Sequence, residues 1–339
     1  MNNHLASHAA RAALAFAFVA SVLTPSISPA QTQTGAYALG ADVSWVNQEE
    51  SSGYSFYNAA KVKTDPFVLL KNLNVNAVRL RVWVNPAGGW CDGADVLYKA
   101  KRAAAQGQRI MIDFHYSDVW ADPGHQTVPT AWAAHTLAQL NTDVYNHTAG
   151  ILSYLKTNGI TVTWVQVGNE INSGMLWPLG STSNFSNLAG LINSGYNATK
   201  SVFPNAKVIL HLANGYNNAD FQWFFDGVKA AGANWDVIGM SHYPPAATWQ
   251  TYNNQLAANM SNMVSRYNKP VMISEVGIDY TQAAIAKNML ADVIAKNKAL
   301  GSYGLGVFYW EPEAYPSWQG YTMGALNASG QFTEALSAY

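Results

Sequence analysis

The stretch Thr163-Trp-Val-Gln-Val-Gly-Asn-Glu-Ile171 decides the fold. Its first half is almost continuously apolar, and a Gly-Asn-Glu triplet ends the apolar run abruptly. A short apolar run of this kind suits a strand buried on both faces, as in a parallel sheet covered by helices. A second run, Val271-Met-Ile-Ser-Glu275-Val-Gly277, is again interrupted by a glutamate. A carboxylate at the end of a buried strand is poorly placed to stabilise the fold and well placed to take part in a reaction.

Strand-like and helix-like segments alternate along the chain. The strand candidates are Ala38–Trp45, Ala77–Val84, Arg109–His115, Val162–Glu170, Lys207–Leu212, Val237–Tyr243, Pro270–Val276 and Gly306–Trp310. The helix candidates are Asp65–Leu73, Ala94–Gln106, Ala131–Thr157, Leu188–Val202, Gln222–Ala231, Trp249–Tyr267, Gln282–Leu300 and a short final Phe332–Ser337. Strict alternation predicts an α/β fold with a parallel sheet, and eight such units predict a single-domain (β/α)8 TIM barrel. A doubly wound open sheet is the alternative, but no G-x-G-x-x-G phosphate loop is present.

Composition narrows the classes of partner. Charged residues make up 12% of the 339 residues and the net charge is −1, so neither a nucleic acid nor a membrane surface is expected as a partner. The chain has 12 Trp and 18 Tyr, which mildly favours a carbohydrate partner because aromatic faces stack on sugar rings. The single cysteine, Cys91, excludes an intramolecular disulfide and is expected to be an unpaired structural thiol.

The N-terminal residues are typical of a targeting segment. Arg11 precedes the apolar stretch Ala12 to Leu23, and small residues follow up to Ala30. This pattern predicts a secretory signal peptide over residues 1–30, a short leader over 31–36 and a catalytic barrel over 37–339. The protein is therefore expected to be secreted, either to the extracellular space or to the periplasm.

Two glutamates are the candidate catalytic residues. In the eight-strand count, Glu170 ends the fourth strand and Glu275 ends the seventh, so both are expected at the mouth of the barrel. The longest irregular connections also follow strands, where barrel enzymes build their sites. Retaining glycoside hydrolysis needs two carboxyl groups ~5–5.5 Å apart. The alternative for either residue is a solvated surface acid or a structural ion pair.

Several longer stretches point to one family. They are Arg79-Leu-Arg-Val-Trp-Val-Asn-Pro86, Asp113-Phe-His-Tyr-Ser-Asp-Val-Trp-Ala-Asp-Pro123 with Gln126 and Pro129-Thr-Ala-Trp132, Gly168-Asn-Glu-Ile-Asn-Ser-Gly-Met-Leu-Trp-Pro-Leu-Gly180, and Tyr309-Trp-Glu-Pro312. Together, and in this order, they resemble the endo-β-1,4-galactanases of glycoside hydrolase family 53, over essentially the whole chain after the leader. The resemblance implies a retaining hydrolase of β-1,4-galactan in pectin side chains. It also implies that Glu170 is the acid/base and Glu275 the nucleophile.

The resemblance further suggests roles around this pair. Asn169 would bind the 2-hydroxyl of the sugar at the cleavage point, and Arg79 would keep Glu275 ionised. Arg81 lies on the same strand face, so the two arginines could exchange roles, and either could instead form a buried ion pair with Asp42 or Asp113.

The remaining candidates are expected at the barrel mouth. Tyr243 would orient Glu275 through its hydroxyl, and Trp310 would lie under the reacting ring. Substrate contacts are also expected from His115 and from His242, which precedes Tyr243. Candidates for the cleft walls are Trp120, Trp132 and Trp177.

No metal or cofactor is predicted. The histidines show no H-x-x-x-H or H-E-x-x-H spacing, and the long loop that carries calcium in some bacterial members of the family is absent after the seventh strand. The expected substrate partner is a β-1,4-galactan polysaccharide, and the chain is expected to be a monomer. The alternatives are another endo-glycanase of the same clan, such as a mannanase or cellulase, and a non-catalytic sugar-binding barrel.

Overall fold

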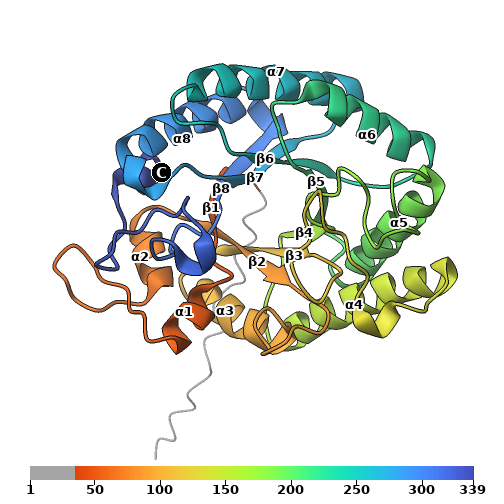
Figure 1. Cartoon of the computed structure of the whole chain (residues 1–339), viewed down its shortest axis with the longest axis horizontal. Helices are drawn as coiled ribbons and strands as arrows, with labels where there is room; N and C mark the ends of the chain where they lie inside the picture. Colours follow the sequence, from red (N-terminus) through yellow and green to blue (C-terminus); the bar gives the residue numbers. More distant parts are fainter. Residues whose placement is uncertain (1–34) are drawn as a thin grey trace, which may run out of the picture. The chain divides into compact units, whose positions relative to one another are not determined.

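Eight parallel strands close into a barrel (Figure 1). The computed structural model describes residues 35–339, so the predicted signal peptide and most of the predicted leader lie outside the described residues. The strands are β1 (Ala38–Asp42), β2 (Ala77–Val82), β3 (Arg109–Phe114), β4 (Trp164–Val167), β5 (Lys207–Leu212), β6 (Val237–His242), β7 (Val271–Val276) and β8 (Gly304–Tyr309). Pairing of β1 with β8 completes the barrel, which confirms the predicted fold class.

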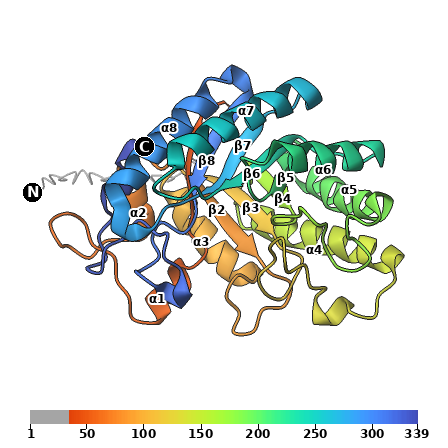
Figure 2. The ribbon, with the colours of Figure 1, turned by 45° about the horizontal axis from the view of Figure 1, so that its top comes forward.

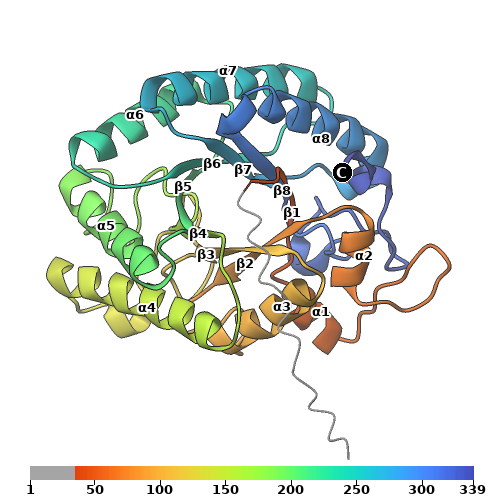
Figure 3. The same ribbon diagram turned by 180° about the vertical axis from the view of Figure 1, so that it is seen from behind.

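Helices surround the strands in both face-on views (Figures 1 and 3). They are α1 (Val46–Ser51), α2 (Pro66–Asn72), α3 (Gly93–Ala105), α4 (Leu137–Thr157), α5 (Phe185–Val202), α6 (Asn218–Ala230), α7 (Trp249–Tyr267) and α8 (Ala283–Lys298). In the tilted view, α5 lies beside α6 and α7 beside α8 (Figure 2). Within residues 35–339, no helix is long and apolar enough to cross a lipid bilayer.

Side chains fill the barrel interior. One residue from each strand contributes to a buried cluster: Ala38, Ala77, Met111, Trp164, Ile209, Val237, Met272 and Phe308. The two largest, Trp164 and Phe308, meet edge to face with ring centroids 6.1 Å apart. Small residues leave room for these two rings: a Cβ at Gly40 would collide with the ring of Phe308. This layer closes the centre of the barrel beneath the site.

The predicted elements are largely confirmed, with three differences. Helix α1 was not predicted from the sequence. The long helix expected over 131–157 begins only at Leu137, where Thr136 and Gln139 form a reciprocal capping box, and Thr130–Trp132 forms a separate 3-10 turn. The final pattern forms a 3-10 helix, Glu334–Ala338, in place of an α-helix.

Candidate active site

A cleft of about 450 Å³ opens at the C-terminal ends of the strands. Its lining comes from strand β7 and from the segments that follow β3, β4, β5, β6 and β8. The residues are His115, Trp120, Ala121, Asp122, Pro123, Asn169, Glu170, Ala213, Asn214, Tyr243, Glu275, Trp310, Tyr321 and Met323. The structure therefore brings together eight of the nine predicted site residues, counting Arg79 beneath the cleft floor.

A sharp backbone turn delivers Glu170 to the cleft. After β4 ends, Gly168 and Glu170 both have left-handed backbones, with φ values of 82° and 46°. Such a conformation is costly for a residue with a side chain and is concentrated at functional sites. Gln126 holds the turn, because its Nε2 donates a 2.9 Å hydrogen bond to the carbonyl oxygen of Asn169. The turn directs the carboxyl group of Glu170 into the cleft, which continuation of the regular strand would not do.

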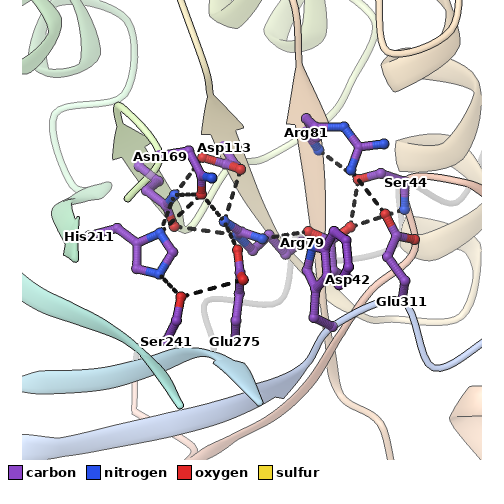
Figure 4. A network of polar contacts seen from close by, with 12 residues as sticks. Asp42, Ser44, Arg79, Arg81, Asp113, Asn169, His211, Ser241, Glu275 and Glu311 are labelled. Carbon is purple, nitrogen blue, oxygen red and sulfur yellow. Dashed lines mark hydrogen bonds and ion pairs between the residues drawn. The ribbon is translucent and has the colours of Figure 1, made fainter. Parts of the chain in front are cut away.

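Arg79 is the centre of the polar network below the cleft (Figure 4). It is 1% exposed. Its Nη1 lies 2.7 Å from Asp42, and its Nη2 lies 2.9 Å from both Asp113 and Glu275. The three carboxylates offset the burial of the guanidinium, and the pKa of Arg79 stays above its ordinary value. The predicted contact between Arg79 and Glu275 is confirmed.

Tyr243 approaches Glu275 from β6. Its hydroxyl donates a 2.8 Å hydrogen bond to Oε2 of Glu275, and Ser241 Oγ lies 3.4 Å from the same oxygen. Burial raises the pKa of Glu275 above its ordinary value, and the charge of Arg79 and the Tyr243 hydrogen bond offset part of that rise. The predicted orientation of Glu275 by Tyr243 is therefore present in the structure.

Glu170 has a different environment. None of the ion pairs formed by residues 35–339 includes it, and burial together with the neighbouring charge of Glu275 raises its pKa to about 8. Glu275 has a cation in contact, whereas Glu170 has none. The arrangement thus favours the protonated form of Glu170 and, through the contact with Arg79, the ionised form of Glu275.

Asn169 is fixed by the same network. Its Oδ1 accepts hydrogen bonds from Arg79 Nη2 at 2.9 Å and Gln166 Nε2 at 3.1 Å, and its Nδ2 donates to the carbonyl of Ala121 at 2.7 Å. His211 Nδ1 lies 3.0 Å from Asn169 Oδ1, and His211 Nε2 lies 2.8 Å from Ser241 Oγ. Burial and the charge of Arg79 lower the pKa of His211 and keep it neutral.

Sequence reasoning missed Gln166 and His211. Both are fully buried polar residues inside otherwise apolar strands. The available signal was the alternation of side chains along a strand. Gln166 is two residues after Trp164 and His211 is two residues after Ile209, so each shares a strand face with a residue of the apolar layer. A polar residue on the inward face above the apolar layer is a candidate for the site floor.

His115 lines the cleft, but its ring is held by the protein. Its Nε2 lies 3.0 Å from Asp113 Oδ2. Its Nδ1 lies 3.1 Å from the backbone nitrogen of Ala121 and 3.3 Å from Trp83 Nε1. Both ring nitrogens are thus engaged, and the contact left for a substrate is the edge of the ring.

The prediction that His242 faces the substrate is wrong. Its Nε2 lies 2.8 Å from Asn253 Oδ1 on α7, and the residue is fully buried. Because Ser241 points into the barrel, its successor on the strand must point outward towards the helices. The register of β6 against β7 also shifts between Met240 and Ser241, which sequence periodicity alone does not reveal.

Aromatic rings form one wall of the cleft. Trp120 and Trp310 lie 5.9 Å apart, and each also contacts Trp45, at 5.6 and 5.3 Å between ring centroids. Tyr321 packs edge to face on Trp310 at 4.6 Å. Trp120 was predicted for the cleft walls and Trp310 for a place under the reacting ring, whereas Trp45 and Tyr321 were not predicted.

The other two tryptophans predicted for the walls lie elsewhere. Trp132 is buried in the core, with its ring 6.0 Å from that of His147. Trp177 lies outside the cleft lining and donates its Nε1 hydrogen to the carbonyl of Ser173 at 2.9 Å.

Arg81 supports the wall and does not contact Glu275. Its guanidinium lies 3.9 Å from the ring centroid of Trp120, and its Nη1 lies 3.1 Å from Glu311. The two arginines of β2 therefore have separate partners, and Arg79 is the one beside the candidate nucleophile.

Over residues 35–339, no group of three or more histidine, cysteine, aspartate or glutamate side chains is arranged to hold a metal ion.

Comparison with known proteins agrees with this geometry. The family model described as "Glycosyl hydrolase family 53" matches residues 38–288. A probable arabinogalactan endo-β-1,4-galactanase A of Aspergillus fumigatus is 34% identical over 300 residues, which are 80% of this chain and 83% of the relative. A solved structure of fungal β-1,4-galactanases superposes with a TM-score of 0.82 at 32% identity, covering 88% of this chain and 97% of the other. The GH53 catalytic domain of Ignisphaera aggregans superposes with a TM-score of 0.79 at 31% identity, covering 88% of this chain and 94% of the other. With a family match over most of the barrel and relatives this similar along their length, the chain belongs to glycosyl hydrolase family 53.

Proposed function

We propose that the protein is a secreted endo-hydrolase that cleaves β-1,4-galactosidic bonds in galactan and arabinogalactan side chains of pectin, with net retention of anomeric configuration. The observation that carries the proposal is the different setting of the two glutamates in one cleft. Glu275 contacts Arg79 and Tyr243, while Glu170 has a pKa raised to about 8.

Each glutamate has one role in the first step. Ionised Glu275 attacks the anomeric carbon of the sugar, while protonated Glu170 gives its proton to the departing glycosidic oxygen. The bond from the anomeric carbon to that oxygen breaks as the bond to the Glu275 carboxylate forms. The shortened chain leaves with a new hydroxyl group, and the remaining sugar is covalently bound to Glu275.

The second step uses the same residues in reverse. Glu170, now ionised, takes a proton from a water molecule that attacks the anomeric carbon and releases Glu275. Two displacements on one carbon restore the original configuration. Asn169 binds the 2-hydroxyl of the reacting sugar, and its fixed position in the Arg79 network supports this role.

Galactan is favoured over other β-1,4-glycans by two arguments. A relative that is 34% identical to this chain and a solved structure that is 32% identical are both named galactanases. In addition, the axial O4 that carries every linkage bends a galactan chain, and an aromatic wall of Trp120 and Trp310, whose rings meet at 68°, suits a bent chain better than the straighter ribbons of cellulose or mannan.

The test is a panel of polysaccharides with product analysis. We expect rapid release of oligosaccharides from unsubstituted β-1,4-galactan, little from mannan or carboxymethyl-cellulose, and β-configured products by NMR at early times. A comparable kcat/KM on mannan or cellulose would contradict the substrate, and α-configured products would contradict retention. Binding of galactan without any hydrolysis would instead support the sugar-binding alternative.

Export and oligomeric state need separate measurements. The signal-like segment supports secretion, and we expect the exported chain to begin at Gln31 when its N-terminus is sequenced. We also propose that the enzyme is a monomer, which light scattering tests directly. Retention of the full-length chain inside the cell would contradict export.

A further inference from the structure

A second hollow of about 290 Å³ lies beside the catalytic cleft. Residues of three segments line it: Pro123 after β3, Asn172 and Thr182 after β4, and Asp220 and Trp223 on α6. Helix α6 lies next to α5 on this side of the barrel (Figure 2). None of these side chains has a part in the catalytic network described above.

The hollow and the cleft share a wall. Pro123 lines both, and its carbonyl accepts a 2.7 Å hydrogen bond from Ser173 Oγ. Asn172 is joined to Ala213, a cleft residue, by hydrogen bonds of 2.8 and 3.3 Å through both ends of its amide. These bonds fix the boundary, so a chain leaving the cleft past Pro123 enters a preformed hollow.

Trp223 gives the hollow an apolar platform. The residue is 53% exposed although it is among the largest apolar side chains. Phe185 packs edge to face against it, with ring centroids 5.3 Å apart and planes at 67°. This contact limits the rotation of the indole and presents it in one orientation, as a stacking surface for a sugar ring requires.

Asp220 supplies the polar side of the same hollow. It lies one helical turn before Trp223 on α6. Its Oδ2 accepts a hydrogen bond of 2.5 Å from Asn217 Nδ2, and this bond holds the carboxylate in place. A fixed carboxylate beside an indole is a suitable combination for a sugar, which offers both an apolar face and hydroxyl donors.

The position of Glu170 decides which part of the substrate reaches the hollow. The acid protonates the oxygen of the leaving group, so the leaving part of the chain lies on the Glu170 side of the reacting ring. Asn172 and Ser173 lie two and three residues after Glu170 in the same loop and line the hollow. Trp310, in contrast, follows β8 and lies with Trp120 in the aromatic wall.

We propose that this hollow is a distal subsite that binds the leaving-group end of a β-1,4-galactan chain, with Trp223 as its stacking platform and Asp220 as a hydrogen-bond acceptor. The proposal rests on the galactanase function proposed above. It assigns Trp223 to chain binding and to the selection of cleavage position along the polymer. It assigns no part in bond cleavage to this residue.

The test compares a long and a short substrate. Trp223→Ala is expected to lower kcat/KM on polymeric galactan roughly fivefold to tenfold, mainly through KM. Its kcat/KM on an aryl β-galactobioside is expected to stay at the wild-type value, because the aryl leaving group ends before the hollow. Trp223→Phe should restore most of the activity on the polymer. The matched control is Tyr154→Ala, an exposed aromatic residue near the C-terminal end of α4.

The outcomes separate this proposal from the function on which it rests. Equal kcat/KM of wild type and Trp223→Ala on the polymer would overturn the subsite, and so would an equal loss on both substrates, which indicates a structural role. If the wild type hydrolyses mannan in place of galactan, the proposed function fails first, and the hollow is no galactan subsite. An unchanged melting temperature of Trp223→Ala completes the expected result.

Discussion

The guanidinium of Arg79 lies 2.9 Å from Oε1 of Glu275, and the same Nη2 lies 2.9 Å from Asp113. A single cation therefore contacts both the candidate nucleophile and the acids beneath it. Since removal of one partner from a buried ion pair leaves an uncompensated charge, the network is expected to be sensitive to substitution at its centre.

Arg79→Lys should lower kcat/KM by about tenfold or more, because lysine keeps the charge but loses the forked contacts with Glu275 and Asp42. Weaker support raises the pKa of Glu275, so the acidic limb of the pH–rate profile should move upward by about one pH unit. The measurement is kcat/KM from pH 3 to 9 with a melting curve at each pH. An unmoved acidic limb in a folded variant would show that Arg79 has no electrostatic effect on Glu275.

The raised pKa of Glu170 predicts the alkaline limb. As the general acid, Glu170 must be protonated, so kcat/KM of the free enzyme should fall as the pH rises through about 8. An aryl substrate with a good leaving group does not need the proton, and the limb should be much weaker with it. An alkaline limb of equal size on galactan and on the aryl substrate would assign that limb to another group.

Azide rescue distinguishes the two glutamates. Glu275→Ala should lose several orders of magnitude in rate, and azide should restore turnover with an inverted glycosyl azide as product. Glu170→Ala should keep rapid first-step attack on activated substrates, and its rescue product should be the retained azide. Near-normal galactan hydrolysis by either variant would show that the assignment is wrong.

The sequence predicted much of this site because its signals are local. Glu170 and Glu275 interrupt apolar strands, and the strand count placed both at one end of the barrel. It did not predict His242 correctly, since a strand pattern gives the alternation but leaves open which set faces inward. It predicted no role for Glu311 and Glu313, which follow Trp310, because their burial depends on loops far apart in the chain.

Glu311 and Glu313, which follow Trp310, form a second polar cluster with Glu49 behind the aromatic wall. Glu49, Glu311 and Glu313 are all fully buried, and Arg81 is the cation in contact with Glu311. Glu311 also accepts the backbone hydrogen of Trp45 at 3.1 Å, and Glu49 accepts that of Tyr315 at 2.8 Å. The cluster thus ties the loop after β8 to the start of α1, directly behind Trp45 and Trp310.

Titration of this cluster should make stability fall towards alkaline pH. Burial raises the pKa of Glu49 to about 8 and that of Glu311 to about 7, and it raises the pKa of Glu313 well above its ordinary value. Between pH ~4.5 and ~8 the folded chain therefore binds more protons at these groups than the unfolded chain does. The free energy of unfolding then decreases as the pH rises, by up to about 1.4 kcal/mol per pH unit for each group.

Glu313→Gln tests this directly. The amide keeps the shape of a protonated carboxyl group but cannot ionise, so the variant should match the wild type near pH 5 and be more stable than it at pH 8. Urea unfolding at a series of pH values gives the difference in slope, and the exposed Glu334→Gln is the matched control. A stability difference that is the same at pH 5 and pH 8 would show that Glu313 does not titrate in this range, and the alkaline loss would have to come from another group.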